Sequence, residues 1–281
     1  MQKTIKHEVY CESIGIHSGE KIKMKIMPAS ENTGIVFIRS DLNTNNIIKA
    51  HFDNVVNTTL CTEIANDSGA KISTVEHIMA ALWGANIDNA TIEVVGTEIP
   101  GMDGSSMHFT DLIAKAGVKL QSARKKIIQI INPICLKEDD KMITIEPNDK
   151  FSVDCMIDFD HKAIGTQRYN FDESVQNFEK DITKARSFGF IDDIAKLQKV
   201  GFAKGASLKN AVGIDSSGIM NKEGLRYHDE FVRHKTLDCI GDLYLAGAKI
   251  KGKIKSFKAG HKLNNGILRK IFSSPQSYKL V

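Results

Sequence analysis

The sequence predicts an α+β protein of two domains, residues 1–124 and 125–281, on three observations. In each half, runs that alternate apolar and polar residues come first and a helical pattern follows, although no sequence repeat relates the halves. A chain of 281 residues is long enough for two domains of ordinary size. Its 42% hydrophobic and 26% charged residues are values of a globular protein, which excludes disordered and fibrous chains.

Period-two alternation of apolar and polar residues predicts the strands of both halves. The alternating runs are short, and turn-forming Gly, Asn and Ser residues separate them. They lie at residues 22–26, 34–38, 90–95, 126–131, 142–146 and 151–156.

Apolar residues at helical spacing predict three main helices. The first covers residues 73–84, where Ser73 and Glu76 match a capping box. The second covers residues 107–116. The third, from about 230 to 248, follows the strands of the second half, so the order of elements is the same in both halves.

A segment from about residue 190 to 213 interrupts the strands of the second half and is a candidate functional insertion. It has more apolar residues than a solvated connection needs, and a short helix is expected at 192–199. Ile191, Ile194 and Leu197 recur there at near-helical spacing. The apolar residues fit either an apolar channel or a small satellite core beneath a long loop.

Charge and cysteine content exclude some classes of protein. A net charge of +4, from 38 basic and 34 acidic residues spread along the chain, does not indicate nucleic-acid binding. Five widely spaced cysteines without a C-x-x-C pair predict reduced thiols and a cytoplasmic protein. We expect neither a signal peptide nor stable membrane insertion, because no run approaches the roughly 18 apolar residues of a membrane helix.

The helix expected near residues 230–248 has one face of polar residues that could bind a cation. At about 100° per residue, Asp238, Asp242 and Lys235 all lie within about 100° of His234, and the opposite arc is apolar. An imidazole and a carboxylate four residues apart lie about 6 Å apart, close enough to bind one cation. The same pattern fits a solvated helix face, so the helix alone does not establish a metal site.

Two further histidines are candidates for the same chemistry. His77 lies about 150° from the apolar stripe of its own helix, so it is poorly explained as a core residue. In zinc hydrolases a carboxylate next to a metal-binding histidine, as Glu76 is here, holds a base near water; Glu76 fits a capping role equally well. His261 lies in a segment that we expect to be a polar loop, where a histidine is usually solvated.

Four stretches together closely resemble the UDP-3-O-acyl-N-acetylglucosamine deacetylases, the zinc amidases of lipid A synthesis. They occur in the family's order, and the resemblance runs from near Gly15 to Asn265, almost the whole chain. The stretches are TVEHIMAAL at 74–82, ARSFGF at 185–190, GLRYHDEFVRHKTLDCIGDL at 224–243 and SFKAGHKLNN at 256–265.

The resemblance implies a role for each matching residue of the reaction centre. Two imidazoles and one carboxylate favour Zn²⁺ without excluding Fe²⁺. The implied roles are zinc ligands for His77, His234 and Asp238, general base for Glu76, and general acid for His261 with Asp242 behind it.

On the substrate side the resemblance implies further contacts and reveals two departures. Ser187 stands where the family usually has a threonine that steadies the oxyanion, which keeps the hydroxyl donor. Phe188 would contact the glucosamine ring, and Lys235 and Lys258 would meet the diphosphate. Ala206 stands where the family more often has glycine.

The implied fold has two structurally similar two-layer α/β domains, with the active site at their interface and an acyl-chain passage formed by the insertion, including Ile194 and Leu197. The implied reaction is hydrolysis of the acetamide of UDP-3-O-acyl-N-acetylglucosamine to UDP-3-O-acyl-glucosamine and acetate. We expect a monomer whose partner is this small molecule. Two alternatives are a different zinc amidohydrolase and a basic binding protein without catalysis, although the latter would not explain the metal-spaced helix face.

Overall fold

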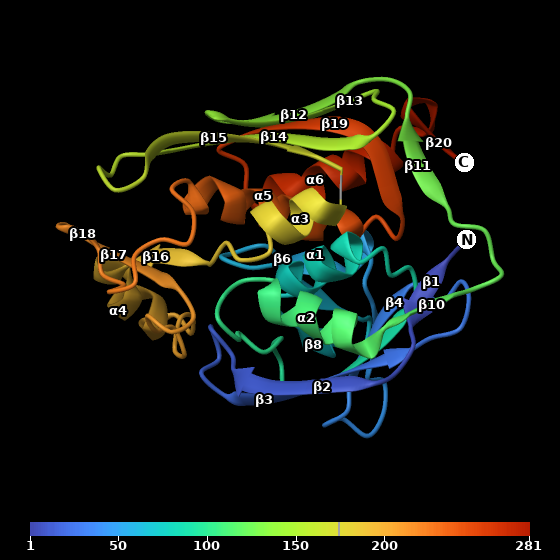
Figure 1. The fold of residues 1–281 in the computed structure, drawn as a ribbon, viewed down its shortest axis with the longest axis horizontal. Helices are drawn as coiled ribbons and strands as arrows, with labels where there is room; N and C mark the ends of the chain where they lie inside the picture. The colour runs from blue at the N-terminus through green and yellow to red at the C-terminus, as the bar shows by residue number, and fades with distance from the viewer. Residues whose placement is uncertain (174) are drawn as a thin grey trace.

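The computed structural model describes residues 1–173 and 175–281 and confirms the α+β class. Two main sheets lie on opposite sides of the molecule, and the longer helices lie between them (Figure 1). Within the described part of the chain, no helix is both long and apolar enough to span a membrane.

Residues 1–124 contribute the sheet at the bottom of Figure 1 and the two helices against it. The helices are α1 (Glu76–Gly84) and α2 (Met107–Ala116). The sheet has the order β2 (Val9–Ile14), β3 (Lys21–Pro28), β9 (Ala90–Val95), β4 (Ile35–Arg39) and β5 (Ile47–Lys49). Shorter strands are β1 (Lys3–Ile5) paired with β10 (Val118–Leu120), and β6 (Val55–Asn57), β7 (Glu63–Ala65) and β8 (Lys71–Ile72), with a 3-10 turn at Phe52–Asn54.

Residues 125–281 contribute the sheet at the top of Figure 1. Its strands are β12 (Ile134–Glu138), β13 (Lys141–Glu146), β19 (Lys249–Phe257), β11 (Ile127–Ile130), β20 (Tyr278–Leu280), β14 (Phe151–Phe159) and β15 (Gly165–Asp172). Strand β19 is central, because it pairs with β13, β11 and β14. The helices of this half are α3 (Val175–Asp181), α5 (Glu230–Tyr244) and α6 (His261–Phe272), with a 3-10 turn at Pro275–Ser277.

The expected insertion is a small unit of its own at the left of Figure 1. Strand β16 (Phe188–Phe190) runs parallel to β17 (Val212–Asp215), which pairs with β18 (Gly218–Ile219). Helix α4 (Ile191–Lys199) connects the two parallel strands. The unit is therefore a βαβ crossover, in which the connection is long enough to join parallel strands, with a short third strand.

No strand pairing in the described part of the chain joins a strand before residue 125 to one after it. The halves meet instead through their helices, above all α1 and α5 (Figure 1). The domain boundary at residue 124/125 itself stays a prediction.

The structure corrects three local expectations. The capping box is wrong: the residue before α1 is Val75, none of the described side chains caps the helix, and Glu76 accepts a hydrogen bond from the backbone N–H of Thr62. The polar loop around His261 is wrong, because His261 is the first residue of α6. The third main helix ends at Tyr244, four residues before its expected end, and the basic run that follows it is strand β19.

Candidate active site

Helices α1 and α5 cross in close contact and bring their polar residues together. A methyl group at Gly241 of α5 would lie 2.0 Å from the backbone oxygen of Glu76 on α1. Only glycine permits this approach, since any side chain would push the helices apart. The polar face of α5 is consequently not solvated: His234, Asp238 and Asp242 are all buried between the two halves.

His77, His234 and Asp238 converge on one point at this helix crossing. Their ligand atoms all lie within 4.8 Å of one another. Oδ1 of Asp238 lies 3.4 Å from Nε2 of His234 and 3.6 Å from Nε2 of His77. Each of the three side chains is at most 4% exposed.

The bonding of Asp238 tests whether these residues fit a metal ion. Its Oδ2 accepts a hydrogen bond from Nζ of Lys235 at 2.9 Å, whereas its buried Oδ1 has no hydrogen-bond partner among the residues that the structure describes. A buried oxygen without a donor costs free energy, yet this one faces two imidazole nitrogens. Two imidazoles and a carboxylate with an orphaned oxygen fit a divalent cation such as zinc.

His234 is held in the form that binds metals. Its Nδ1 donates to the backbone oxygen of Ala185 at 3.1 Å, which leaves the lone pair on Nε2 facing His77 and Asp238. Burial lowers the pKa of His234 to about 3, so the ring is neutral at physiological pH. Burial opposes ionisation of Asp238, but His234 and Lys235 beside it hold the pKa of this carboxyl well below its usual range. His234 and Asp238 are thus prepared as neutral imidazole and carboxylate. For His77, burial opposes the charged form, but Asp238 and Glu76 outweigh it and raise its pKa, so binding of a cation there would displace a proton.

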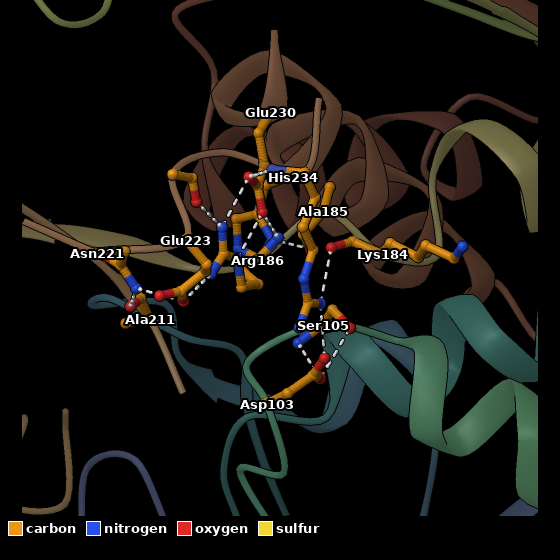
Figure 2. A network of polar contacts seen from close by, with 12 residues as sticks. Asp103, Ser105, Lys184, Ala185, Arg186, Ala211, Asn221, Glu223, Glu230 and His234 are labelled. Carbon is orange, nitrogen blue, oxygen red and sulfur yellow. Dashed lines mark hydrogen bonds and ion pairs between the residues drawn. The ribbon is translucent and has the colours of Figure 1, made fainter. Parts of the chain in front are cut away.

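A buried ion pair fixes the segment that carries the Ala185 carbonyl (Figure 2). Arg186 donates from Nε and Nη2 to the two carboxylate oxygens of Glu230, at 2.8 and 3.1 Å. Its Nη1 donates to Glu223 at 3.0 Å. Because Arg186 is 2% and Glu230 0% exposed, the pair is desolvated, and the loss of either partner would leave a buried charge.

A second cluster lies beside the first and contains Glu76, Asp242 and His261. Their ligand atoms also lie within 4.8 Å of one another. Nδ1 of His261 lies 2.8 Å from Oδ2 of Asp242. Burial opposes the charged form of His261, but Asp242 and Glu76 outweigh it and raise its pKa to about 9. Burial also opposes the charged form of Glu76. For a carboxyl group this raises the pKa, which makes the Glu76 carboxylate a stronger proton acceptor.

Two polar residues complete the bonding of Asp242 and were not singled out from the sequence. Thr62 donates from Oγ1 to Oδ1 of Asp242 at 2.6 Å, and Asn264 donates from Nδ2 to Oδ2 at 2.8 Å. Asn264 lies in one of the four recognised stretches, which was a usable signal, although its place one helical turn after His261 became clear only with α6. Thr62 had none, because it comes from a turn far away in the sequence.

The residues expected on the substrate side lie around this centre at different depths. Ser187 is half-buried and directly precedes β16, and its backbone N–H donates to Gly104 at 2.8 Å. The ring centroid of Phe188 lies 6.2 Å from that of His234, and Nζ of Lys235 lies 5.6 Å from the Phe188 centroid. Lys258 stands apart from these, since its Nζ pairs with Asp140 at 3.1 Å and Asp158 at 3.0 Å.

The insertion presents apolar side chains that the chain itself covers only partly. Ile194 and Leu197 are half-buried in α4, whose other residues are exposed. Ile191, Leu208 and Met220 surround Gly213, where a methyl group would lie 2.6 Å from Leu208. These three apolar residues are nevertheless 38–40% exposed, so the unit offers an apolar surface, and its strand β16 carries Phe188 beside His234.

Fold and site together define a class: an α+β protein with a buried His/Asp cluster that could bind a metal ion, beside a carboxylate–imidazole pair that could transfer protons. The chain belongs to the UDP-3-O-acyl N-acetylglycosamine deacetylase family, whose model matches residues 2–273. It is 46% identical over 282 residues to the UDP-3-O-acyl-N-acetylglucosamine deacetylase of Shewanella frigidimarina, covering 100% of this chain and 92% of that protein. It is 45% identical, with the same coverage, to the protein of that name from Haemophilus influenzae.

Proposed function

We propose that this protein hydrolyses the acetamide of UDP-3-O-acyl-N-acetylglucosamine, giving UDP-3-O-acyl-glucosamine and acetate, as a cytoplasmic monomeric enzyme of lipid A biosynthesis. Membership of the family supports the substrate class. The observation that carries the chemistry is the orphaned Oδ1 of Asp238, which faces two imidazoles next to the Glu76–Asp242–His261 cluster. We retain the boundary at residue 124/125 as part of the proposal.

His77, His234 and Asp238 would hold the metal, and their chemistry suits Zn²⁺ first and Fe²⁺ second. When bound, a zinc ion would act as a Lewis acid and lower the pKa of water toward about 7. The chain supplies the rest of the preparation. Ala185 orients His234, and Lys235 occupies the other oxygen of Asp238, so two of the three ligands are held in place.

Glu76 and His261 would move the protons of the reaction. Glu76 accepts a proton from water as the water oxygen attacks the acetamide carbonyl carbon. The C–N bond then breaks, and His261 donates its proton to the departing amine nitrogen, which is a poor leaving group without it. The raised pKa of His261, about 9, keeps it protonated at neutral pH, and its hydrogen bond with Asp242 fixes its orientation.

The remaining residues would bind and orient the substrate. The Ser187 hydroxyl would donate to the developing oxyanion. Phe188 would contact the sugar ring, and Lys235 would approach the diphosphate from beside the ring. Lys258 would meet the diphosphate only after exchanging its bonds with Asp140 and Asp158. Ile194 and Leu197 would contact the acyl chain.

The test is metal analysis combined with acetate release by the purified protein. We expect one tightly held divalent metal per chain and release of acetate from UDP-3-O-acyl-N-acetylglucosamine, but none from an N-acetylated peptide. Equal activity on both substrates would indicate a different amidohydrolase. A protein that binds metal and substrate but releases no acetate would contradict the proposal and favour a binding role.

A further inference from the structure

Thr62 reaches the reaction centre from a turn that has no other part in the proposed chemistry. The turn joins β6 to β7, and Leu60 within it has a φ of 65°, a left-handed conformation that is uncommon for a leucine. The oxygen of Thr62 accepts a hydrogen bond from the backbone N–H of Val75 at 3.3 Å, directly before α1. Thr62 is consequently fixed beneath the first turn of α1 and is 1% exposed.

Two groups of Thr62 contact two different carboxylates of the site. Its backbone N–H donates to Oε2 of Glu76 at 3.0 Å, and its side-chain Oγ1 donates to Oδ1 of Asp242 at 2.6 Å. Both carboxylates are 2% exposed, so water does not replace these bonds readily. One residue thereby contacts the base of the proposed reaction and the carboxylate that orients its acid.

The two oxygens of Asp242 have different partners, which gives the hydroxyl a specific task. Oδ2 contacts both Nδ1 of His261 and Nδ2 of Asn264, whereas Oδ1 has one donor within the described ranges of the chain, the Thr62 hydroxyl. A carboxylate held at both oxygens cannot rotate about its Cβ–Cγ bond without breaking a short bond. The hydroxyl thus fixes the plane of Asp242 and, through Oδ2, the direction of the His261 ring.

We propose that Thr62 is a positioning residue for the proposed deacetylation: its hydroxyl sets the Asp242–His261 pair while its backbone N–H holds Glu76. The inference rests on the proposed function, because it assigns His261 the role of acid. A purely structural role would predict a loss of stability instead, since a hydroxyl bonded to a buried carboxylate also stabilises the fold.

The experiment compares Thr62→Val with Thr62→Ser. Valine removes the hydroxyl at nearly constant shape and leaves the backbone N–H on Glu76, whereas serine restores the hydroxyl. We expect Thr62→Val to lower kcat by about 10- to 100-fold, with KM within about twofold and full metal content, and Thr62→Ser to recover most of the loss. Thr4→Val is the control, because Thr4 is also buried but bonds the backbone of Ala29 far from the site.

A double-mutant cycle separates positioning from stability. In a His261→Ala background, Thr62→Val should cause no further loss of kcat, because the group that it positions is gone. A full additional loss there, a Thr62→Ser as impaired as Thr62→Val, or a Thr62→Val with wild-type kcat would each overturn the proposal. Should Thr62→Val fail to fold, Thr62→Ala in the same cycle decides between the same outcomes.

A spectroscopic measurement needs no turnover and so distinguishes this inference from the proposed function. In ¹⁵N-histidine-labelled protein we expect the Nδ1 proton of His261 to resonate far downfield and to exchange slowly with water. Thr62→Val should shift this signal and speed its exchange, and Thr4→Val should not. An unchanged signal would overturn the positioning role even in an active enzyme, whereas absent acetate release by the wild type would contradict the proposed function alone.

Discussion

The α1–α5 crossing and the insertion differ in how completely the rest of the chain buries their side chains. At the crossing, His77 and His234 are each 3% exposed, and among the described residues only Oδ1 of Asp238 and Oδ1 of Asn264 are buried there without a hydrogen-bond partner. In the insertion, Val200 is 68% exposed, and α4 has no buried residue. The reacting groups are therefore arranged before substrate arrives, whereas the insertion leaves apolar surface to be covered by something else.

This difference has a physical reason. Charged and polar groups become strongly coupled only where water is excluded, so a reaction centre benefits from burial between two rigid helices. An apolar chain, by contrast, needs only contact area, and a thin βαβ unit can supply that area without a tightly packed core. Substitutions at the crossing should thus lower the rate of the chemical step, and substitutions in the insertion should change the substrate preference.

The largest effect is expected from a lost metal ligand at the crossing. His77→Ala should lose bound metal and lower kcat/KM by about 10³-fold or more, because several kcal/mol of transition-state stabilisation disappear with the ion. Its circular dichroism should remain that of a folded protein. Metal content by atomic emission checks the prediction, with the exposed His7→Ala as control, and full occupancy in His77→Ala would contradict the assignment.

A smaller loss of a different kind is expected at the neighbouring residue. Glu76→Gln keeps the shape and burial but removes the proton acceptor, so kcat should fall by about 10²- to 10⁴-fold while the metal stays bound. Metal content and steady-state kinetics on the same preparation check this. If Glu76→Gln lost metal as His77→Ala does, Glu76 would be a ligand and the division between the two clusters would be wrong.

The pH profile tests His261, which belongs to the second cluster at the crossing. Because His261 must be protonated to act as an acid and its pKa is about 9, kcat/KM should stay high through neutral pH and fall above about pH 9. His261→Gln should flatten this alkaline limb and lower kcat by about 10²-fold, whereas His228→Gln, at an exposed position, should do neither. An alkaline limb that survives in His261→Gln would assign the titration to another group.

The sequence predicted the polar face of α5 better than the contacts that this face makes, and the reason is geometric. The i, i+4 spacing of His234 and Asp238 belongs to one helix, so periodicity alone places both on one face. The meeting of this face with His77, and the contact of Thr62 with Asp242, join segments far apart in the chain, and no local pattern records them. The capping box that Ser73 and Glu76 match does not form, because the N–H of Thr62, which the local motif does not record, holds the Glu76 carboxylate instead.

The smallest effect is expected in the insertion, where the contrast with the crossing can be tested most directly. If Ile194 and Leu197 contact the acyl chain, Ile194→Asp and Leu197→Asp should reduce the preference for the 3-O-acylated substrate over UDP-N-acetylglucosamine by about 10-fold, because burying one such side chain contributes about 1.5–3 kcal/mol. Activity on the unacylated compound should change little, since the reacting groups at the crossing are untouched. Ala195→Asp is the matched control, because it adds the same single negative charge to α4 at an exposed position. The competing interpretation, a satellite core beneath a loop, predicts instead a lower unfolding temperature with an unchanged preference. Measuring kcat/KM on both substrates together with thermal unfolding decides between them, and a wild-type enzyme indifferent to the acyl chain would show that the exposed apolar surface serves another purpose.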